Sequence, residues 1–367
     1  MCKFQTNDNS PDKTFVSLLK SVRIDMATSL GVGIGVALIT CLLIYGSAAD
    51  VGNITKVGKL LIDTDAGADD AIAILMALQS QKLYGDANVV GITCVNGNTD
   101  VDNVVLNVLK TLKIVDRLDV PVYKGSHQPL LLNDEKTDYF GTDGFGDFEY
   151  PDPPSTDLVQ EKHAVNAMID LVKANPGEVT LLALGPLTNV AMAIRMYSSF
   201  IDELQQLIIL GGSSEGVGNV RPGIEYNFAV DPAANYIVLN ASMSKPAILL
   251  PYETSERAKT TMAFRTSWNA TDNPKVWLIN SAESVTLNPD SEYWECADGV
   301  AAAVALTSGT IVTKSKSLYS NAIYEGSLTA GMVAIDYSNL TQKAPNTNLI
   351  QDVDANEFKN MLLTLLN

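Results

Sequence analysis

Histidine and cysteine, which supply much acid–base and thiol chemistry, are scarce in this chain. Only two histidines, His127 and His163, occur among 367 residues. A zinc site built on histidine and a Ser-His-Asp triad are therefore constrained from the start. The four cysteines form no CxxC pair, so nothing supports a zinc ribbon or a thioredoxin-like site.

Basic residues are also few, with 25 Lys and Arg against 42 Asp and Glu, which gives a net charge of −17. This balance argues against nucleic-acid phosphates and anionic lipid surfaces as partners. No internal repeat, low-complexity tract or strong linker divides the chain after Asp50. We therefore predict one catalytic or binding domain over residues 50–367.

Charge is absent altogether from residues 26–49, which follow a polar leader at residues 1–25 that we predict to be disordered. The run is long enough to span a bilayer and ends in small residues that suit signal peptidase. Three export interpretations stay open: a cleaved signal with a long leader, a signal that starts at Met26, or an uncleaved membrane anchor. A buried core helix is the alternative without export.

Each export interpretation makes the protein secreted, or membrane-anchored with its main domain outside the cytosol. Contact with a membrane is then expected only through residues 26–49. Four N-x-S/T sequons agree with export and predict a glycoprotein, at Asn53, Asn240, Asn269 and Asn339.

From Lys59 onward, short apolar runs alternate with helical patterns. Strands are predicted at 60–62, 88–95, 120–123, 179–184, 207–210 and 247–250, helices at 71–78, 101–115, 162–174 and 187–196, and a long loop at 133–154. This alternation predicts an α/β fold, a mostly parallel open sheet with helices on both faces. Ligands bind such sheets beyond the carboxyl ends of the strands, where the polar segments 63–70, 96–98 and 185–188 fall.

Residues 60–78, LLIDTDAGADDAIAILMAL, hold the strongest chemical signal in the chain. Four aspartates follow the apolar strand within eight residues, at Asp63, Asp65, Asp69 and Asp70. One or two of them could be ordinary helix caps in a charged loop. Four carboxylates this close repel one another unless a cation neutralises them, so we predict a hard-cation site.

The motifs DTDAGADDAIAI, ITCVNGNTDVDNVVLNVLKTL, LLALGPLTNVAMAI and GNVRPGIEYNFAVDPAAN follow one another in this order, with ADGVAAAVAL later. In these motifs the chain resembles the inosine-uridine-preferring nucleoside hydrolases, from about Lys59 to the C-terminus. The resemblance implies calcium-dependent hydrolysis of the N-glycosidic bond of ribonucleosides, giving free base and ribose. It also allows a homo-oligomer.

Carried over residue by residue, the resemblance implies that Asp65 is the base acting on a metal-bound water. It implies a Ca²⁺ ion held by Asp65, Asp70, Asp298 and the backbone carbonyl of Thr188. The residues that would hold the ribose are Asp69, Asn98, Asn219, Glu225 and Asn227, while Asp63 would support the loop.

Several of these residues also have a purely structural interpretation. Asn98 and Asn219 each follow glycine, as in a common turn. Glu225 and Asn227 alternate with aromatic residues, as on an exposed strand face. Asn189 and Asp231 suit helix caps, and we interpret both histidines as structural.

This chain departs from the family pattern at residues that would protonate the departing base, which is the leaving group. Many members carry histidines where this chain has Ala297 and Phe140. Aromatic stacking by Phe140, with Tyr139 or Trp294, would ease protonation of the base and favour purines. Cys296 is a second candidate acid, although we favour its interpretation as an ordinary semi-buried thiol.

Two other functions fit parts of the sequence. A nucleoside- or ribose-binding protein on the same scaffold would not need Asp65. An aspartyl-phosphate phosphohydrolase also begins with D-x-D, but it expects Thr or Val where Gly67 stands and does not expect Asp69 and Asp70.

Overall fold

The computed structural model describes residues 54–131, 137–268 and 272–366. The polar leader and the apolar run at residues 26–49 lie outside these ranges, so the predictions made for them stay predictions. Within the described ranges, no helix combines the length and apolar character needed to cross a membrane.

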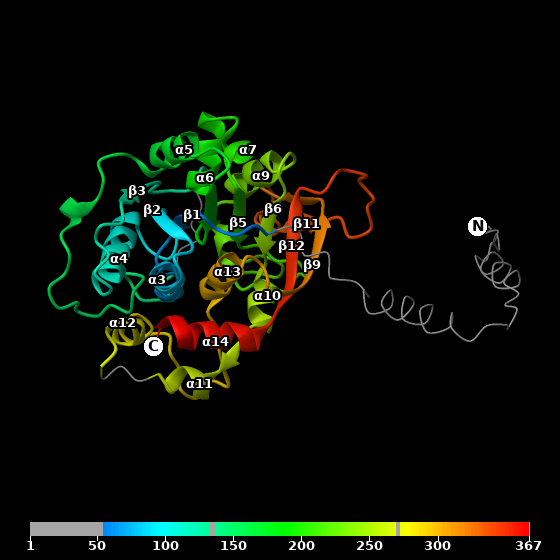
Figure 1. Ribbon diagram of the computed structural model, residues 1–367. Coiled ribbons are helices and arrows are strands. Elements are labelled where there is room, and N and C mark those ends of the chain that lie inside the picture. The colour runs from blue at the N-terminus through cyan, green and yellow to red at the C-terminus, as the bar shows by residue number, and fades with distance from the viewer. Residues whose placement is uncertain (1–53, 132–136, 269–271, 367) are drawn as a thin grey trace, which may run out of the picture. The chain divides into compact units, whose positions relative to one another are not determined.

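A sheet of eight strands forms the centre of the described part (Figure 1). Every neighbouring pair is parallel except the last, in which β9 runs antiparallel to β12. The predicted α/β architecture with a mostly parallel sheet is therefore confirmed. The order across the sheet is β3 (Val122–Lys124), β2 (Asn88–Cys94), β1 (Lys59–Thr64), β4 (Val179–Ala183), β5 (Gln206–Leu210), β6 (Ala247–Leu250), β12 (Thr347–Val353) and β9 (Val312–Leu318).

The sheet is covered on both faces because successive side chains of its strands point in opposite directions. Leu60 and Ile62 of β1 pack on one face and Leu61 on the other. The first face is covered by α3 (Ala68–Tyr84), α4 (Val101–Lys113), α13 (Ala297–Leu306) and α14 (Ala355–Leu366). The second face is covered by α5 (Ala164–Ala174), α6 (Thr188–Met196), α7 (Phe200–Glu203) and α9 (Pro232–Ala241).

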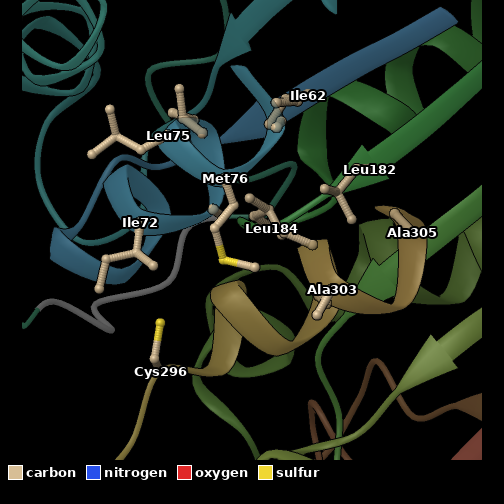
Figure 2. Packing of buried hydrophobic residues seen from close by; sticks show 14 of the residues in the cluster. Ile62, Ile72, Leu75, Met76, Leu182, Leu184, Cys296, Ala303 and Ala305 are labelled. Carbon is tan, nitrogen blue, oxygen red and sulfur yellow. The ribbon is translucent and has the colours of Figure 1, made fainter. Parts of the chain in front are cut away.

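Helices α3 and α13 pack closely against one another, because α13 is rich in alanine and glycine. In Figure 2, Ile72 and Met76 of α3 lie near Ala303 of α13 and Cys296 at its start. Asp70 and Asp298 occupy the first turns of these two helices, so this packing brings two aspartates from distant parts of the sequence together.

Short elements between the main helices and strands surround the carboxyl edge of the sheet. An exposed strand face is one prediction for residues 225–228. These residues instead begin helix α8, for which Glu225 is the N-cap. The described part of the predicted loop 133–154 contains no helix or strand. The short elements are η1 (Thr156–Leu158), α8 (Tyr226–Val230), α10 (Tyr252–Arg257), β7 (Thr260–Thr261), α11 (Met262–Thr266), α12 (Pro274–Ala282), β8 (Tyr293–Trp294), β10 (Ser320–Ala322) and β11 (Val333–Ile335).

Candidate active site

A pocket of about 390 Å³ opens at the carboxyl edge of the parallel strands. Asp65 follows β1, Asn98 follows β2 and Leu184 follows β4, and all three line it. Two of the polar segments predicted to meet at this edge, 63–70 and 96–98, therefore do line one pocket, whereas the third, 185–188, is represented only by its neighbour Leu184. Of the predicted site residues, the pocket is lined by Asp65, Asp69, Asn98, Phe140, Asn219, Glu225, Asn227 and Asp298.

Aspartates form the floor of the pocket. Carboxylate oxygens of Asp69, Asp70 and Asp298 lie within 4.8 Å of one another. Burial, followed by the negative charges of Asp70 and Asp69, raises the pKa of Asp65 well above its usual range. Burial and neighbouring aspartates also raise the pKa of Asp298, and they raise that of Asp69 to about 7. The four carboxyl groups thus behave as one electrostatic cluster.

Local backbone geometry holds Asp65 in place. Its Oδ2 accepts a hydrogen bond of 2.8 Å from the backbone N–H of Asn98. A Cβ added at Gly97 would lie only 2.0 Å from that same oxygen, so only glycine permits this close approach. Asp70 accepts from the N–H of Gly67 at 2.8 Å and from the hydroxyl of Thr64. Asp70 is therefore held from the backbone below the pocket.

The cluster fits a hard divalent cation. Asp298 Oδ1 is buried and has no hydrogen-bond partner among the described residues, although a buried polar atom is normally satisfied. The donors gathered here are carboxylate oxygens, the ligands that Ca²⁺ prefers.

Asp63 supports the cluster from below, at 0 % exposure. Its Oδ1 accepts from Thr93 Oγ1 at 2.7 Å and from Asn189 Nδ2 at 2.9 Å. Asn189 also accepts from Ser126 and lies inside α6, whose N-cap is Leu187, so the prediction that Asn189 caps this helix is wrong. Asn189 instead links strands across the sheet under the pocket.

Polar side chains line the side of the pocket opposite the aspartates. Glu225 accepts from the N–H groups of Gly212, Asn227 and Phe228, which makes it both an N-cap and a pocket residue. Burial, which outweighs these hydrogen bonds, raises its pKa to about 7. Asn219 accepts from the N–H of Tyr226 at 2.9 Å. Amide and carboxyl groups of this kind can bind sugar hydroxyls.

Thr188 is not among the residues that line the pocket. Its hydroxyl donates to Asp231 at 2.6 Å, and Asp231 in turn caps α9 as predicted. Leu184 is the residue of this segment that lines the pocket, and its carbonyl accepts from Asn227 Nδ2 at 2.6 Å. The Leu184 carbonyl is therefore a second candidate for a backbone ligand from this part of the chain, and the role of the Thr188 carbonyl stays a prediction.

The predicted stacking residues Tyr139, Phe140 and Trp294 all line the pocket. Tyr139 and Phe140 pack edge to face, with ring centroids 4.8 Å apart, and Trp294 also lines the pocket. The indole N–H of Trp294 donates to Glu283 at 2.9 Å, and Glu283 is paired with the buried Arg265. These residues offer both ring faces and fixed polar groups to a planar ligand.

Several wall residues carry no sequence signal, namely Tyr252, Glu283 and Glu295. They come from short elements without periodicity, which only the chain fold brings to the pocket. His127, His163 and Cys296 do not line it. His163 caps α5 through its Nδ1, and Cys296 is only 3 % exposed within the core, so a structural role accounts for both.

The protein thus has the α/β fold of many enzymes, and a pocket lined with carboxylates that could bind a cation lies at the carboxyl edge of its sheet. The sequence profile described as inosine-uridine preferring nucleoside hydrolase matches residues 60–360. The chain therefore belongs to the inosine-uridine preferring nucleoside hydrolase family, and it is a nucleoside hydrolase, an N-glycosidase.

The names of similar proteins state different substrates, some with pyrimidine bases and some with purine bases. The chain is 42 % identical to uridine nucleosidase 1 of Arabidopsis thaliana over 185 residues, which is 50 % of this chain and 53 % of that enzyme. It is 30 % identical to the pyrimidine-specific ribonucleoside hydrolase RihA of Enterobacter, over 83 % of this chain and 96 % of that enzyme. A solved structure named inosine-guanosine nucleoside hydrolase matches with a TM-score of 0.78 and 30 % identity, covering 84 % of this chain and 98 % of that chain.

Proposed function

We propose that this nucleoside hydrolase depends on calcium, releases free base and ribose from ribonucleosides, and prefers purine nucleosides. The observation that carries the proposal is one pocket in which Asp65 lies beside an acidic cluster and faces polar side chains. Asp65, Asp70, Asp298 and the backbone carbonyl of Thr188 or Leu184 would hold Ca²⁺. Bound there, the ion would supply a Lewis acid beside the sugar and favour the ionised form of the cluster.

The protein's own residues account for the remaining chemistry. Asp65 accepts the proton of the attacking water, because an ionised carboxylate within the pocket can act as a general base. Asp69, Asn98, Asn219, Glu225 and Asn227 bind the ribose and fix C1′ for attack. The sugar develops oxocarbenium character as the bond breaks, and the surrounding carboxylates stabilise that positive charge.

The preference for purines is supported by the aromatic residues of the pocket. Phe140 and Trp294 line the pocket, and a purine offers more ring surface for stacking than a pyrimidine. The names of the relatives point in both directions, so this preference is the part of the proposal that most needs a direct measurement.

The decisive experiment measures ribose released from inosine, guanosine, adenosine, uridine and cytidine, with and without a calcium chelator. We expect release that the chelator abolishes and added calcium restores, with purines ahead. Release that resists the chelator would overturn the calcium dependence. No release by protein that still binds calcium would favour the nucleoside-binding alternative.

We also propose that residues after Asp50 lie outside the cytosol, on the support of the uncharged run and the sequons. Two sequons fall in the described part, and both Asn240 and Asn339 are exposed. The test is expression through a secretory pathway, followed by treatment with peptide N-glycosidase. A loss of mass that Asn339→Gln reduces is expected, and an unchanged mass would contradict the proposal.

A further inference from the structure

A pair of glutamates on the pocket wall has no role in the chemistry described so far. Glu295 lines the pocket between β8 and α13, and its side chain is 39 % exposed. Glu256, in α10, lies close to it, because the ammonium group of Lys259 reaches a carboxylate oxygen of each glutamate. Two carboxylates this close repel one another, which favours a proton on one of them.

The charged neighbours decide which member carries that proton. Lys259 Nζ lies 2.5 Å from Glu256 Oε1 but 3.6 Å from Glu295 Oε2, so the ammonium group favours an ionised Glu256. Burial raises the pKa of the Tyr252 and Tyr139 hydroxyls, and the negative charge of Glu295 helps to raise it, so both are neutral neighbours. The proton accordingly belongs on Glu295.

The titration behaviour agrees with this assignment. Burial, followed by the hydrogen bond with Glu256, raises the pKa of Glu295 to about 7. Burial opposes ionisation of Glu256, but the hydrogen bonds with Glu295 and Lys259 lower its pKa overall. A group with a pKa near neutrality is well matched to general acid catalysis.

Glu295 also stands at the right place in the chain. It is three residues before Asp298, a proposed calcium ligand. Pairing of Trp294 with Thr260 fixes one side of this segment, and the start of α13 fixes the other. The Glu295 side chain thus reaches the pocket from a segment that is held at both ends.

We propose that Glu295 is the acid that protonates the departing base in place of the missing histidine, and that Glu256 is a positioning residue that keeps the proton on Glu295. This inference rests on the proposed function. As the bond from C1′ to nitrogen breaks, its electron pair passes to the base, and the Glu295 proton moves to the base. Water attacks C1′ and gives one proton to Asp65. Asp65 then returns its proton to solvent, while Glu295 takes one up.

The test compares substrates that do and do not need leaving-group protonation. Glu295→Gln should lower kcat for inosine by about 10²- to 10⁴-fold, because general acid catalysis is lost. The same variant should change kcat for 4-nitrophenyl β-D-ribofuranoside by less than about threefold, because nitrophenolate leaves without a proton. Glu161→Gln, at an exposed position outside the pocket, is the matched control and should leave both rates unchanged.

The pH profile tests the role of Glu256. Hydrolysis of inosine should fall as the pH rises through about 7, where Glu295 loses its proton, whereas the nitrophenyl riboside should show no such fall. Glu256→Gln removes the negative charge that retains the proton, so the fall should move to lower pH. The groups that face Glu295 in this experiment are Glu256, Lys259, Tyr252 and Tyr139.

The possible failures are distinguishable. Equal losses on both substrates in Glu295→Gln would overturn the acid role and leave the hydrolase intact. An unmoved profile in Glu256→Gln would overturn the positioning role. No release of nitrophenolate or base by the wild-type protein would overturn the proposed function, and this inference with it.

Discussion

Asp65 is the residue whose replacement separates catalysis from folding. We expect Asp65→Asn to lower kcat by about 10²- to 10⁴-fold in the ribose-release assay, because the proposed general base is lost. Its negative charge is crowded by Asp69 and Asp70, so its removal should not lower the melting temperature of the metal-free protein. Asp290→Asn, at an exposed position, is the control. A variant that keeps a tenth of wild-type activity would contradict the assignment.

Replacement of Phe140 tests how strongly aromatic stacking contributes to the proposed preference for purine bases. An aromatic stack contributes about 0.5–1.5 kcal/mol, so Phe140→Ala should lower kcat/KM for inosine by about 2- to 12-fold more than for uridine. Phe140→Tyr keeps the ring and serves as the control, with a preference near that of the wild type. Equal losses on both nucleosides in Phe140→Ala would exclude a stacking role.

At the scale of elements, a buried ion pair between Arg265 and Glu283 helps to fix the position of Trp294 in the pocket wall. Arg265, which is 1 % exposed in α11, donates to Glu283 at 2.8 Å, and Glu283 accepts from Trp294 of β8. Arg265→Met would leave Glu283 buried without its cation. We expect a loss of about 3–5 kcal/mol in the free energy of unfolding, measured by urea denaturation.

The double variant Arg265→Met with Glu283→Gln should recover part of that loss, because it no longer buries an uncompensated charge. The exposed Arg195→Met provides the control for loss of a surface arginine. If the single and double variants were equally destabilised, packing of the arginine side chain, and not its charge, would hold the wall.

At the scale of the whole molecule, the buried acids couple folding to pH and to calcium. Burial raises the pKa of Asp63 and Asp69 to about 7. The stability that their protonated forms contribute is present below about pH 4 and is lost as the pH rises through about 7. The metal-free protein should therefore melt at a higher temperature at pH 5 than at pH 8.

The proposed calcium ion would bind the ionised carboxylates, so its stabilising effect should be larger at pH 8 than at pH 5. At a free concentration of about 100 times Kd, it should stabilise the fold by about 2.7 kcal/mol. Thermal melts with calcium or chelator at both pH values check this, and added salt screens the surface charge of a −17 protein. A metal-free melting temperature that rises from pH 5 to pH 8 would contradict the coupling.

The positions of strands β1 to β6 along the chain could be predicted in outline because each is a short, continuous apolar run between turn residues. Strand β9 was not predicted, since residues 312–318 alternate polar and charged side chains at the antiparallel edge of the sheet. The helix at Tyr226–Val230 was also missed, because a five-residue helix shows too little periodicity and depends on the Glu225 cap.

The sequence by itself determined the α/β class and placed Asp65, Asp69 and Asp70 at the end of the first strand, because strand periodicity and local charge are properties of neighbouring residues. Only the tertiary structure brought Asp298 to them, through the packing of α13 on α3. Likewise, only the tertiary structure shows that Glu283 and Glu295 line the pocket. It also shows that the Thr188 hydroxyl donates a hydrogen bond to Asp231. Contacts between residues distant in sequence depend on how whole helices and strands pack, and no local pattern encodes that packing.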